Sequence, residues 1–192
     1  MGKRVYSTTV LTGTALLSAL VIVFDYALRY SGLKLPFPWY PNLKFDFTGV
    51  PIVLGLLMYG LPSATVTALV AGLGIFVRSG NFLSASLKSV AELATVGGMS
   101  LGIYFSARFK PAVPEEGSRR LMSVVTVYGL FSRVLLMTLV NWAVLPLFYG
   151  VPIEVTYGLL PLIGVFNAIQ GGVTILLGFF FNDAVRRRLP DF

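Results

Sequence analysis

Six polar side chains lie inside stretches that are otherwise strongly apolar, and they carry most of the chemistry that this chain could perform. They are Asp25, Glu92, Arg133, Asn141, Asn167 and Gln170. An ionisable group at membrane depth costs roughly 2.5–3.5 kcal/mol on insertion, so such groups are expected to pair with one another or to contact a ligand. Carboxylate, guanidinium and amide groups together suit hydrogen bonding to a polar small molecule.

Spacing along helices predicts which of these groups meet. Asp25 and Arg29 are four residues apart, as are Lys88 and Glu92, and side chains at this spacing lie on one helix face. We interpret Asp25 and Arg29 as a structural ion pair. For Lys88 and Glu92 two hypotheses stay open, namely a local salt bridge and a pair that lines a cavity and contacts a polar ligand.

The remaining candidates lie in the C-terminal half. Asn167 and Gln170 are three residues apart and share a helix face. They serve either as interhelical hydrogen-bonding groups or as a polar patch at a binding pocket. Asn141 precedes Trp142, a residue type common at the membrane–water interface. Arg133 lies deep in its apolar stretch and has no obvious local partner.

The composition is that of a membrane protein. The chain is 56% hydrophobic and 12% charged, with a mean hydropathy of +0.81, whereas about 25% of the residues in a soluble domain are charged. A spanning helix needs roughly 20 mostly apolar residues, and continuous apolar runs argue against a membrane β-barrel. We predict an all-α membrane protein, a bundle of six transmembrane helices forming a single integral membrane domain over residues 1–192. The predicted helices cover residues 9–28, 47–59, 63–77, 86–108, 121–149 and 157–185.

The residue types exclude several kinds of chemistry. The chain has no Cys and no His, which excludes disulfides, thiolate nucleophiles and His-based acid–base catalysis, and no metal site is expected. We interpret the net charge of +7 as a signal of membrane topology rather than of nucleic-acid binding. The first apolar stretch continues to about Leu28, which is too long for a typical signal peptide.

The distribution of cations predicts the orientation. With six spans, one side holds Lys3, Arg4, Arg108, Lys110, Arg119, Arg120, Arg186, Arg187 and Arg188, and the other side holds Arg29, Lys34, Lys44, Arg78 and Lys88. By the positive-inside rule both termini are cytoplasmic. The hydrophilic linker 110–120 is then cytoplasmic as well, and segment 33–46 faces the outside.

Segment 33–46 is an unusual connection between the first two predicted helices. Prolines at positions 36, 38 and 41 force extended or turn geometry. Trp39, Tyr40 and Phe45 suit a membrane–water boundary. We predict a stiff aromatic loop at the outer rim of the bundle, as a site that captures a ligand would need.

Small residues four positions apart allow helices to approach closely. Such pairs are Ala15 with Ala19, Ala64 with Ala68, Ala68 with Gly72, and Gly98 with Gly102. We interpret most of them as internal packing contacts.

Four segments match a known family in the correct order. LPFPWYPNLKFDFTGVP at 35–51 is similar to a family segment LPFLP…L.DFSDVP, and VRSGNFL at 77–83 to VKNLLNYL. VNWAVLPLFYG at 140–150 is similar to LNYFVLLPLYG, and IGVFNAIQG at 163–171 to IPFNIIKG. On these segments the chain resembles the substrate-binding S component of an energy-coupling-factor (ECF) vitamin transporter, and the riboflavin-specific type is the most similar.

The resemblance implies a function and partners. It implies an extracellular gating loop between the first two helices, capture of riboflavin from the outer side, and delivery through an ATP-driven module of a transmembrane T subunit and two ATP-binding subunits. Ala15 and Ala19 match the pair that docks on the T subunit. The residues expected to bind the ligand are Tyr40, Leu43, Phe45, Asp46, Asn81, Lys88, Glu92, Asn141, Trp142, Asn167 and Gln170.

The same resemblance implies a multi-pass, non-enzymatic protein of a prokaryotic plasma membrane, surrounded by lipid. Riboflavin is expected as the transported ligand and not as a cofactor. The chain lacks a G-x-x-x-x-G-K-[ST] nucleotide-binding loop, so ATP hydrolysis is expected to belong to the partner subunits.

Two positions depart from the family pattern and keep other ligands open. Gln170 replaces a lysine of the sixth helix, and Glu92 replaces an asparagine of the fourth. Losing a cation and gaining an anion favours donor-rich or cationic ligands. A thiamine precursor or another amine-bearing vitamin is therefore the alternative to riboflavin.

Two further classes of function stay open. A membrane enzyme needs a nucleophile–base pair or a metal–carboxylate cluster, which the predicted spans lack. A structural or assembly subunit without a ligand would use the same polar groups for packing. The concentration of aromatic and amide residues toward the outer side argues against that interpretation.

Overall fold

A computed structural model describes residues 8–109 and 116–188 of the chain. These residues form α1 (Thr8–Tyr30), β1 (Leu35–Phe37), β2 (Tyr40–Phe45), α2 (Gly49–Tyr59), α3 (Leu61–Ser79), α4 (Phe82–Phe109), α5 (Glu116–Tyr149) and α6 (Ile153–Arg188). Lys3, Arg4 and Lys110, which entered the prediction of orientation, lie outside the described residues, as does the central part of the predicted linker.

Five of the described helices are long and apolar enough to cross a membrane, namely α1, α3, α4, α5 and α6. The exception, α2, has 11 residues and is about 16 Å long, roughly half the thickness of a bilayer core. Its residues from Gly49 to Leu56 are all buried. The short α2 is therefore shielded by neighbouring helices, as a helix of this length must be in an apolar medium.

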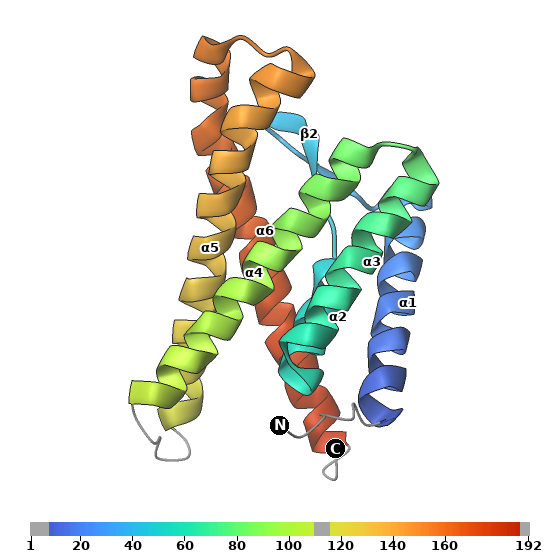
Figure 1. The fold of residues 1–192 in the computed structure, drawn as a ribbon, viewed down its shortest axis with the longest axis vertical. Coiled ribbons are helices and arrows are strands. Elements are labelled where there is room, and N and C mark those ends of the chain that lie inside the picture. The colour runs from blue at the N-terminus through green and yellow to red at the C-terminus, as the bar shows by residue number, and fades with distance from the viewer. Residues whose placement is uncertain (1–7, 110–115, 189–192) are drawn as a thin grey trace, which may run out of the picture.

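The helices pack along one another, and the β1–β2 hairpin crosses one end of the bundle (Figure 1). The described start of α1 and the described end of α6 lie together at the opposite end of the molecule (Figure 1). α1 packs on α2 and α3, α4 packs on α3 and α5, and α6 packs on α5 and α2. The hairpin contacts α6 through β2, so the segment between α1 and α2 reaches over to the last helix.

Small residues allow the close approach of α4 and α5. A Cβ atom at Gly98 would lie 2.4 Å from the carbonyl oxygen of Tyr128, and one at Gly102 would lie 2.9 Å from a backbone atom of α5. On α3, Ala64 and Ala68 are fully buried. The interpretation of these pairs as internal packing contacts is confirmed.

The Pro-rich segment forms an antiparallel hairpin, which the sequence did not predict. Leu35 pairs with Phe45 and Phe37 with Tyr40, with an irregular register between Pro36 and Phe37. Both strands of a two-stranded ribbon are edge strands. Proline is tolerated in such strands because its nitrogen, which lacks an N–H, can face away from the partner strand without removing an inter-strand hydrogen bond. The expected loop is thus a short β-ribbon over the bundle.

The corner between α3 and α4 explains why α4 begins four residues before the predicted start. Gly80 adopts a left-handed φ of 67° and ends α3, with its N–H donating to the Phe76 carbonyl at 2.8 Å. The Asn81 side chain then accepts a hydrogen bond from the Ser84 N–H at 2.9 Å, which is the geometry of a helix N-cap. Asn81 is exposed and caps α4 in this structure.

The predicted pair of Asp25 with Arg29 is wrong. Asp25 is only 2% exposed; it forms ion pairs with Lys34, which precedes β1, and with Arg78 of α3, whose Nε lies 2.7 Å from Oδ2. Arg29 is exposed. A buried carboxylate with two cations from different segments therefore fixes the first end of the hairpin to α1 and α3.

Candidate ligand-binding site

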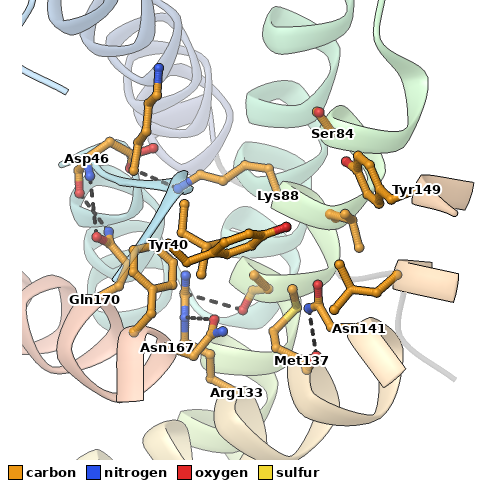
Figure 2. A pocket seen from close by; sticks show the side chains of 16 residues that line it. Tyr40, Asp46, Ser84, Lys88, Arg133, Met137, Asn141, Tyr149, Asn167 and Gln170 are labelled. Atoms are coloured by element: carbon orange, nitrogen blue, oxygen red, sulfur yellow. Dashed lines mark hydrogen bonds and ion pairs between the residues drawn. The ribbon is translucent and has the colours of Figure 1, made fainter. Parts of the chain in front are cut away.

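A cavity of about 220 Å³ lies beneath the hairpin, between β2, α4, α5 and α6. In Figure 2 the Tyr40 ring crosses the middle of the cavity, with Asp46 and Gln170 to one side and Asn141 and Tyr149 to the other. The lining residues are Tyr40, Leu43, Lys44, Asp46, Ser84, Leu87, Lys88, Ala91, Arg133, Met137, Asn141, Leu145, Tyr149, Phe166, Asn167 and Gln170. The site thus combines an apolar wall with a few convergent polar groups, as small-molecule pockets do.

The hairpin is fastened to α6 by a side-chain amide. Gln170 donates from Nε2 to the Asp46 carbonyl oxygen at 2.7 Å and accepts at Oε1 from the Asp46 N–H at 3.3 Å. The amide therefore pairs with the backbone of one residue as a neighbouring strand would. Gln170 lines the cavity, but its main contacts are with the hairpin.

The same residue is fastened to α4 by an ion pair. Lys88 Nζ lies 2.9 Å from Asp46 Oδ1, and this oxygen also accepts from the Thr48 N–H and hydroxyl at 3.2 and 2.7 Å. These hydrogen bonds turn the chain from β2 into α2. Backbone and side chain of Asp46 together hold the second end of the hairpin in place.

Charge and burial oppose each other at Asp46. Burial raises the pKa of the carboxyl, but the Lys88 ammonium and the hydrogen bonds from Lys88 and Thr48 outweigh it and hold the pKa at about 2. Asp46 is therefore ionised over the physiological pH range, and the ion pair with Lys88 persists throughout it.

A buried polar network forms the floor of the cavity. Glu92 is fully buried, and its Oε1 lies 2.9 Å from Lys88 Nζ and 3.2 Å from Arg133 Nη1. Arg133 Nη1 also donates to the Thr95 hydroxyl at 2.9 Å, and Nε donates to Asn167 Oδ1 at 3.3 Å. The local salt bridge of Lys88 with Glu92 is confirmed. Lys88 also lines the cavity, whereas Glu92 does not, and contact of the pair with a ligand stays a prediction.

Two asparagines present amide groups to the cavity from α5 and α6. Asn141 Nδ2 donates to the Met137 carbonyl at 2.8 Å, and Asn167 Nδ2 donates to the Ile163 carbonyl at 2.9 Å. Each amide is thus oriented by its own helix. Asn167 Oδ1 accepts a hydrogen bond from Arg133, whereas among the described residues nothing donates to Asn141 Oδ1.

The aromatic residues of the hairpin divide into two groups. Phe37 is 1% exposed and packs edge-on against Phe45 and Phe166, with ring centroids 5.9 and 5.6 Å away; Phe45 and Phe166 are 4.9 Å apart. This cluster seats the hairpin on α6 by apolar and ring contacts. Tyr40, on the other side of the turn, lines the cavity.

The structure brings together seven of the eleven residues expected to bind the ligand. They are Tyr40, Leu43, Asp46, Lys88, Asn141, Asn167 and Gln170. Glu92 lies directly behind the lining, in contact with Lys88 and Arg133. Phe45 belongs to the aromatic cluster, Asn81 caps α4, and Trp142 is 48% exposed and outside the lining.

Nine lining residues were not among the expected binding residues. They are Lys44, Ser84, Leu87, Ala91, Arg133, Met137, Leu145, Tyr149 and Phe166. Arg133 could have been included, because an unpaired cation deep in a membrane span requires a partner. Apolar lining residues such as Leu145 carry no such signal, since they look like any other residue of an apolar helix.

Outside the cavity, Ala15 and Ala19 lie exposed on α1, although Gly13 and Ser18 of the same helix are buried. One side of α1 thus packs into the bundle while the side with the two alanines is uncovered. Among the described residues, no cluster of three or more His, Cys, Asp or Glu side chains could hold a metal ion.

Comparison with known proteins gives a fold match. No protein-family model and no curated protein sequence matches the chain. A solved structure of the S component of a bacterial ECF transporter is similar, with a TM-score of 0.66 and 21% sequence identity, covering 94% of this chain and 97% of that one. At this identity the likeness establishes the fold, which the chain shares over nearly its whole length.

Proposed function

We propose that this chain is the substrate-binding subunit of an ECF-type vitamin transporter and that it captures riboflavin at the outer face of a prokaryotic plasma membrane. The observation that carries the proposal is a polar-floored cavity beneath a hairpin, in a chain that has the fold of an S component over 94% of its length. The hairpin end then faces outward, and both termini are cytoplasmic.

The shape and chemistry of the cavity suit a flat heterocycle. Tyr40 and Phe166 supply aromatic faces and Met137 a thioether, groups that pack well on a planar ring. Asn141 offers a donor and an acceptor to the ring edge. Apolar burial supplies most of the affinity and the amides supply orientation.

The charges favour riboflavin over a cationic ligand. Glu92 is already bound by Lys88 and Arg133, and Asp46 is already bound by Lys88. Each carboxylate is thus paired with a cation, and the one Glu92 oxygen without a hydrogen-bond partner, Oε2, is fully enclosed. Arg133 provides a cation in the same cavity that carries Gln170 in place of a lysine, and this supports riboflavin over an amine-bearing vitamin.

The hairpin is proposed to act as the gate. Its second end is held by Gln170 and Lys88 and its first end by the ion pairs of Asp25. Opening requires only the contacts of Asp46 and the aromatic cluster to break, while the Asp25 contacts remain as a hinge. Closure over a bound ligand excludes water and slows release.

The proposed partners follow from the same assignment. The uncovered Ala15 and Ala19 side of α1 is proposed to dock on a transmembrane T subunit, where small residues permit close helix packing. Two ATP-binding subunits supply the energy, and this chain binds and releases without catalysing a reaction.

The proposal is tested on protein purified in mild detergent without added vitamin. An absorbance spectrum and mass spectrometry of the released small molecules are expected to identify riboflavin, or added riboflavin is expected to bind with a nanomolar-range Kd. Release of a thiamine precursor would redirect the assignment to the other ligand class. Absence of binding to either class would leave an assembly subunit as the better interpretation.

A pair of adjacent substitutions locates the site. Asn141→Leu removes an amide that lines the cavity, whereas Trp142→Leu removes a large side chain on the outer surface of the same helix. The first is expected to weaken riboflavin binding roughly 5- to 10-fold, for the loss of one neutral hydrogen bond. The second is expected to leave binding unchanged, and the reverse pattern would place the ligand elsewhere.

A further inference from the structure

Arg133 holds a buried guanidinium with one unused end. Its Nε donates to Asn167, and its Nη1 donates to Thr95 and Glu92 and lies 3.5 Å from the Ala91 carbonyl oxygen. The side chain is 3% exposed. A planar group held by partners on α4 and α6 cannot turn freely, so the direction of its remaining nitrogen is fixed.

The remaining nitrogen, Nη2, is available to a ligand. Within the described parts of the chain, the hydrogen bonds of Arg133 come from Nε and Nη1, and Nη2 makes none. Nη2 is also not among the fully enclosed polar atoms that lack a partner, which are Glu92 Oε2, Thr126 Oγ1 and Asn182 Oδ1. Arg133 lines the cavity, so the open side of Nη2 is the cavity itself. Two N–H donors there require an acceptor.

The charges around Arg133 restrict what that acceptor can be. Lys88 and Arg133 are paired with Asp46 and Glu92, so this ion-pair group holds two cations and two anions. Lys44 also belongs to the lining, but it is exposed to solvent and lies outside this group. A ligand carboxylate at Nη2 would add a third anion beside Glu92, and a ligand amine would add a third cation beside Arg133. Either leaves an unpaired buried charge, which is costly. An uncharged carbonyl oxygen keeps the balance.

We infer that Arg133 is a specificity-determining residue, whose Nη2 donates to a ring carbonyl of an uncharged heterocyclic ligand. Glu92 and Asn167 act through Arg133 as positioning residues, because they fix the guanidinium plane. The inference rests on the proposed function and adds to it the part of the ligand that this site recognises.

The test combines a substitution with ligand analogues. Arg133→Lys keeps a cation that can reach Glu92 but lacks the planar fork with its second terminal nitrogen. The probes are riboflavin, 2-thioriboflavin and 4-thioriboflavin, in which one ring carbonyl becomes a poorly accepting thiocarbonyl, and thiamine as a cationic ligand. Equilibrium binding is measured on the purified full-length chain. Arg78→Lys, the same exchange at the Asp25 ion pairs outside the cavity, is the control.

Wild-type protein is expected to bind riboflavin, to bind one of the two thio analogues roughly 10- to 100-fold more weakly, and not to prefer thiamine. In Arg133→Lys the affinity for riboflavin is expected to fall by a similar factor, and the difference between riboflavin and that analogue to disappear. A merely structural role would lower all affinities together and keep the difference, as Arg78→Lys is expected to do if it has any effect.

Each failure has its own meaning. Equal binding of riboflavin by wild type and Arg133→Lys, or a retained thio-analogue difference in the variant, overturns the role of Arg133 while the proposed function stands. If the variant does not fold, wild-type protein that binds both thio analogues as tightly as riboflavin overturns it. If wild-type protein binds thiamine in place of riboflavin, or binds none of the probes, the riboflavin proposal is rejected and this inference with it.

Discussion

Gln170→Leu is expected to loosen the hairpin without unfolding the bundle. The substitution removes two hydrogen bonds, at 2.7 and 3.3 Å, between the side-chain amide and the backbone of Asp46. Each is worth about 0.5–1.5 kcal/mol net, so the closed hairpin loses about 1–3 kcal/mol relative to the open one. The ratio of open to closed hairpin is therefore expected to be roughly 5- to 150-fold higher in the variant than in the wild type. The ion pair of Asp46 with Lys88 remains, so closure is weakened and not abolished.

Amide hydrogen exchange of residues 35–46 in detergent measures this opening without any ligand. Exchange of the hairpin amides is expected to accelerate by the factor above, while α4 and α5 keep their protection. If riboflavin is the ligand, its release rate is expected to rise in the same variant, because release requires an open hairpin.

Asn182→Leu is the matched control for this prediction. Asn182 is another buried amide of α6, twelve positions further along than Gln170 and about 18 Å away, and it is not part of the cavity lining. Its replacement is expected to leave hairpin exchange unchanged. Wild-type exchange rates in Gln170→Leu, or equal acceleration in both variants, would refute the role of Gln170 as a fastening of the hairpin.

Three further predictions follow from other parts of the structure. The pKa of Asp46 is held at about 2, against about 3.9 in an unfolded chain. The melting temperature is therefore expected not to respond to this group above about pH 4. Between about pH 4 and 2 the free energy of unfolding is expected to fall by up to about 2 kcal/mol, because the unfolded state binds the proton first. A loss of the stabilisation by Asp46 near pH 6 would contradict the assignment. Asp25→Asn leaves two half-buried cations, Lys34 and Arg78, without their carboxylate and is expected to cost up to about 3 kcal/mol, seen as a lower melting temperature, whereas Arg29→Gln at the exposed neighbour is expected to be neutral. Ala15→Leu with Ala19→Leu is expected to abolish copurification of a T subunit and to leave riboflavin binding intact; loss of both would indicate a damaged bundle.

Hydropathy predicted the helices because it depends on each segment alone. The predicted span 9–28 lies within the observed Thr8–Tyr30, and 157–185 lies within Ile153–Arg188. The errors lie at the ends, where capping by residues such as Asn81 decides the boundary. The hairpin was missed because its strands are stabilised by contacts with α6, and proline content alone favours an irregular loop.

The candidate site was predictable where a residue type was itself unusual in a membrane. Asn141, Asn167 and Gln170 attract attention because amides are rare in apolar helices, and all three line the cavity. Partners were not predictable in the same way. Spacing along one helix suggested Arg29 for Asp25, but the actual partners come from the hairpin and α3, because the turn after α1 and the packing of α3 bring those cations to the buried side of α1.

Lys88 connects the two halves of the site. It bridges Asp46, which belongs to the hairpin, and Glu92, which belongs to the floor and is also held by Arg133. With the hairpin closed, the group holds two cations and two anions; with Asp46 withdrawn, the same group holds two cations and one anion. Such an imbalance is costly in an apolar surrounding, so the electrostatic balance of the floor itself favours the closed hairpin. Substitution of a floor residue is therefore expected to alter gate opening as well as ligand affinity, and the hydrogen exchange of residues 35–46 separates these two effects.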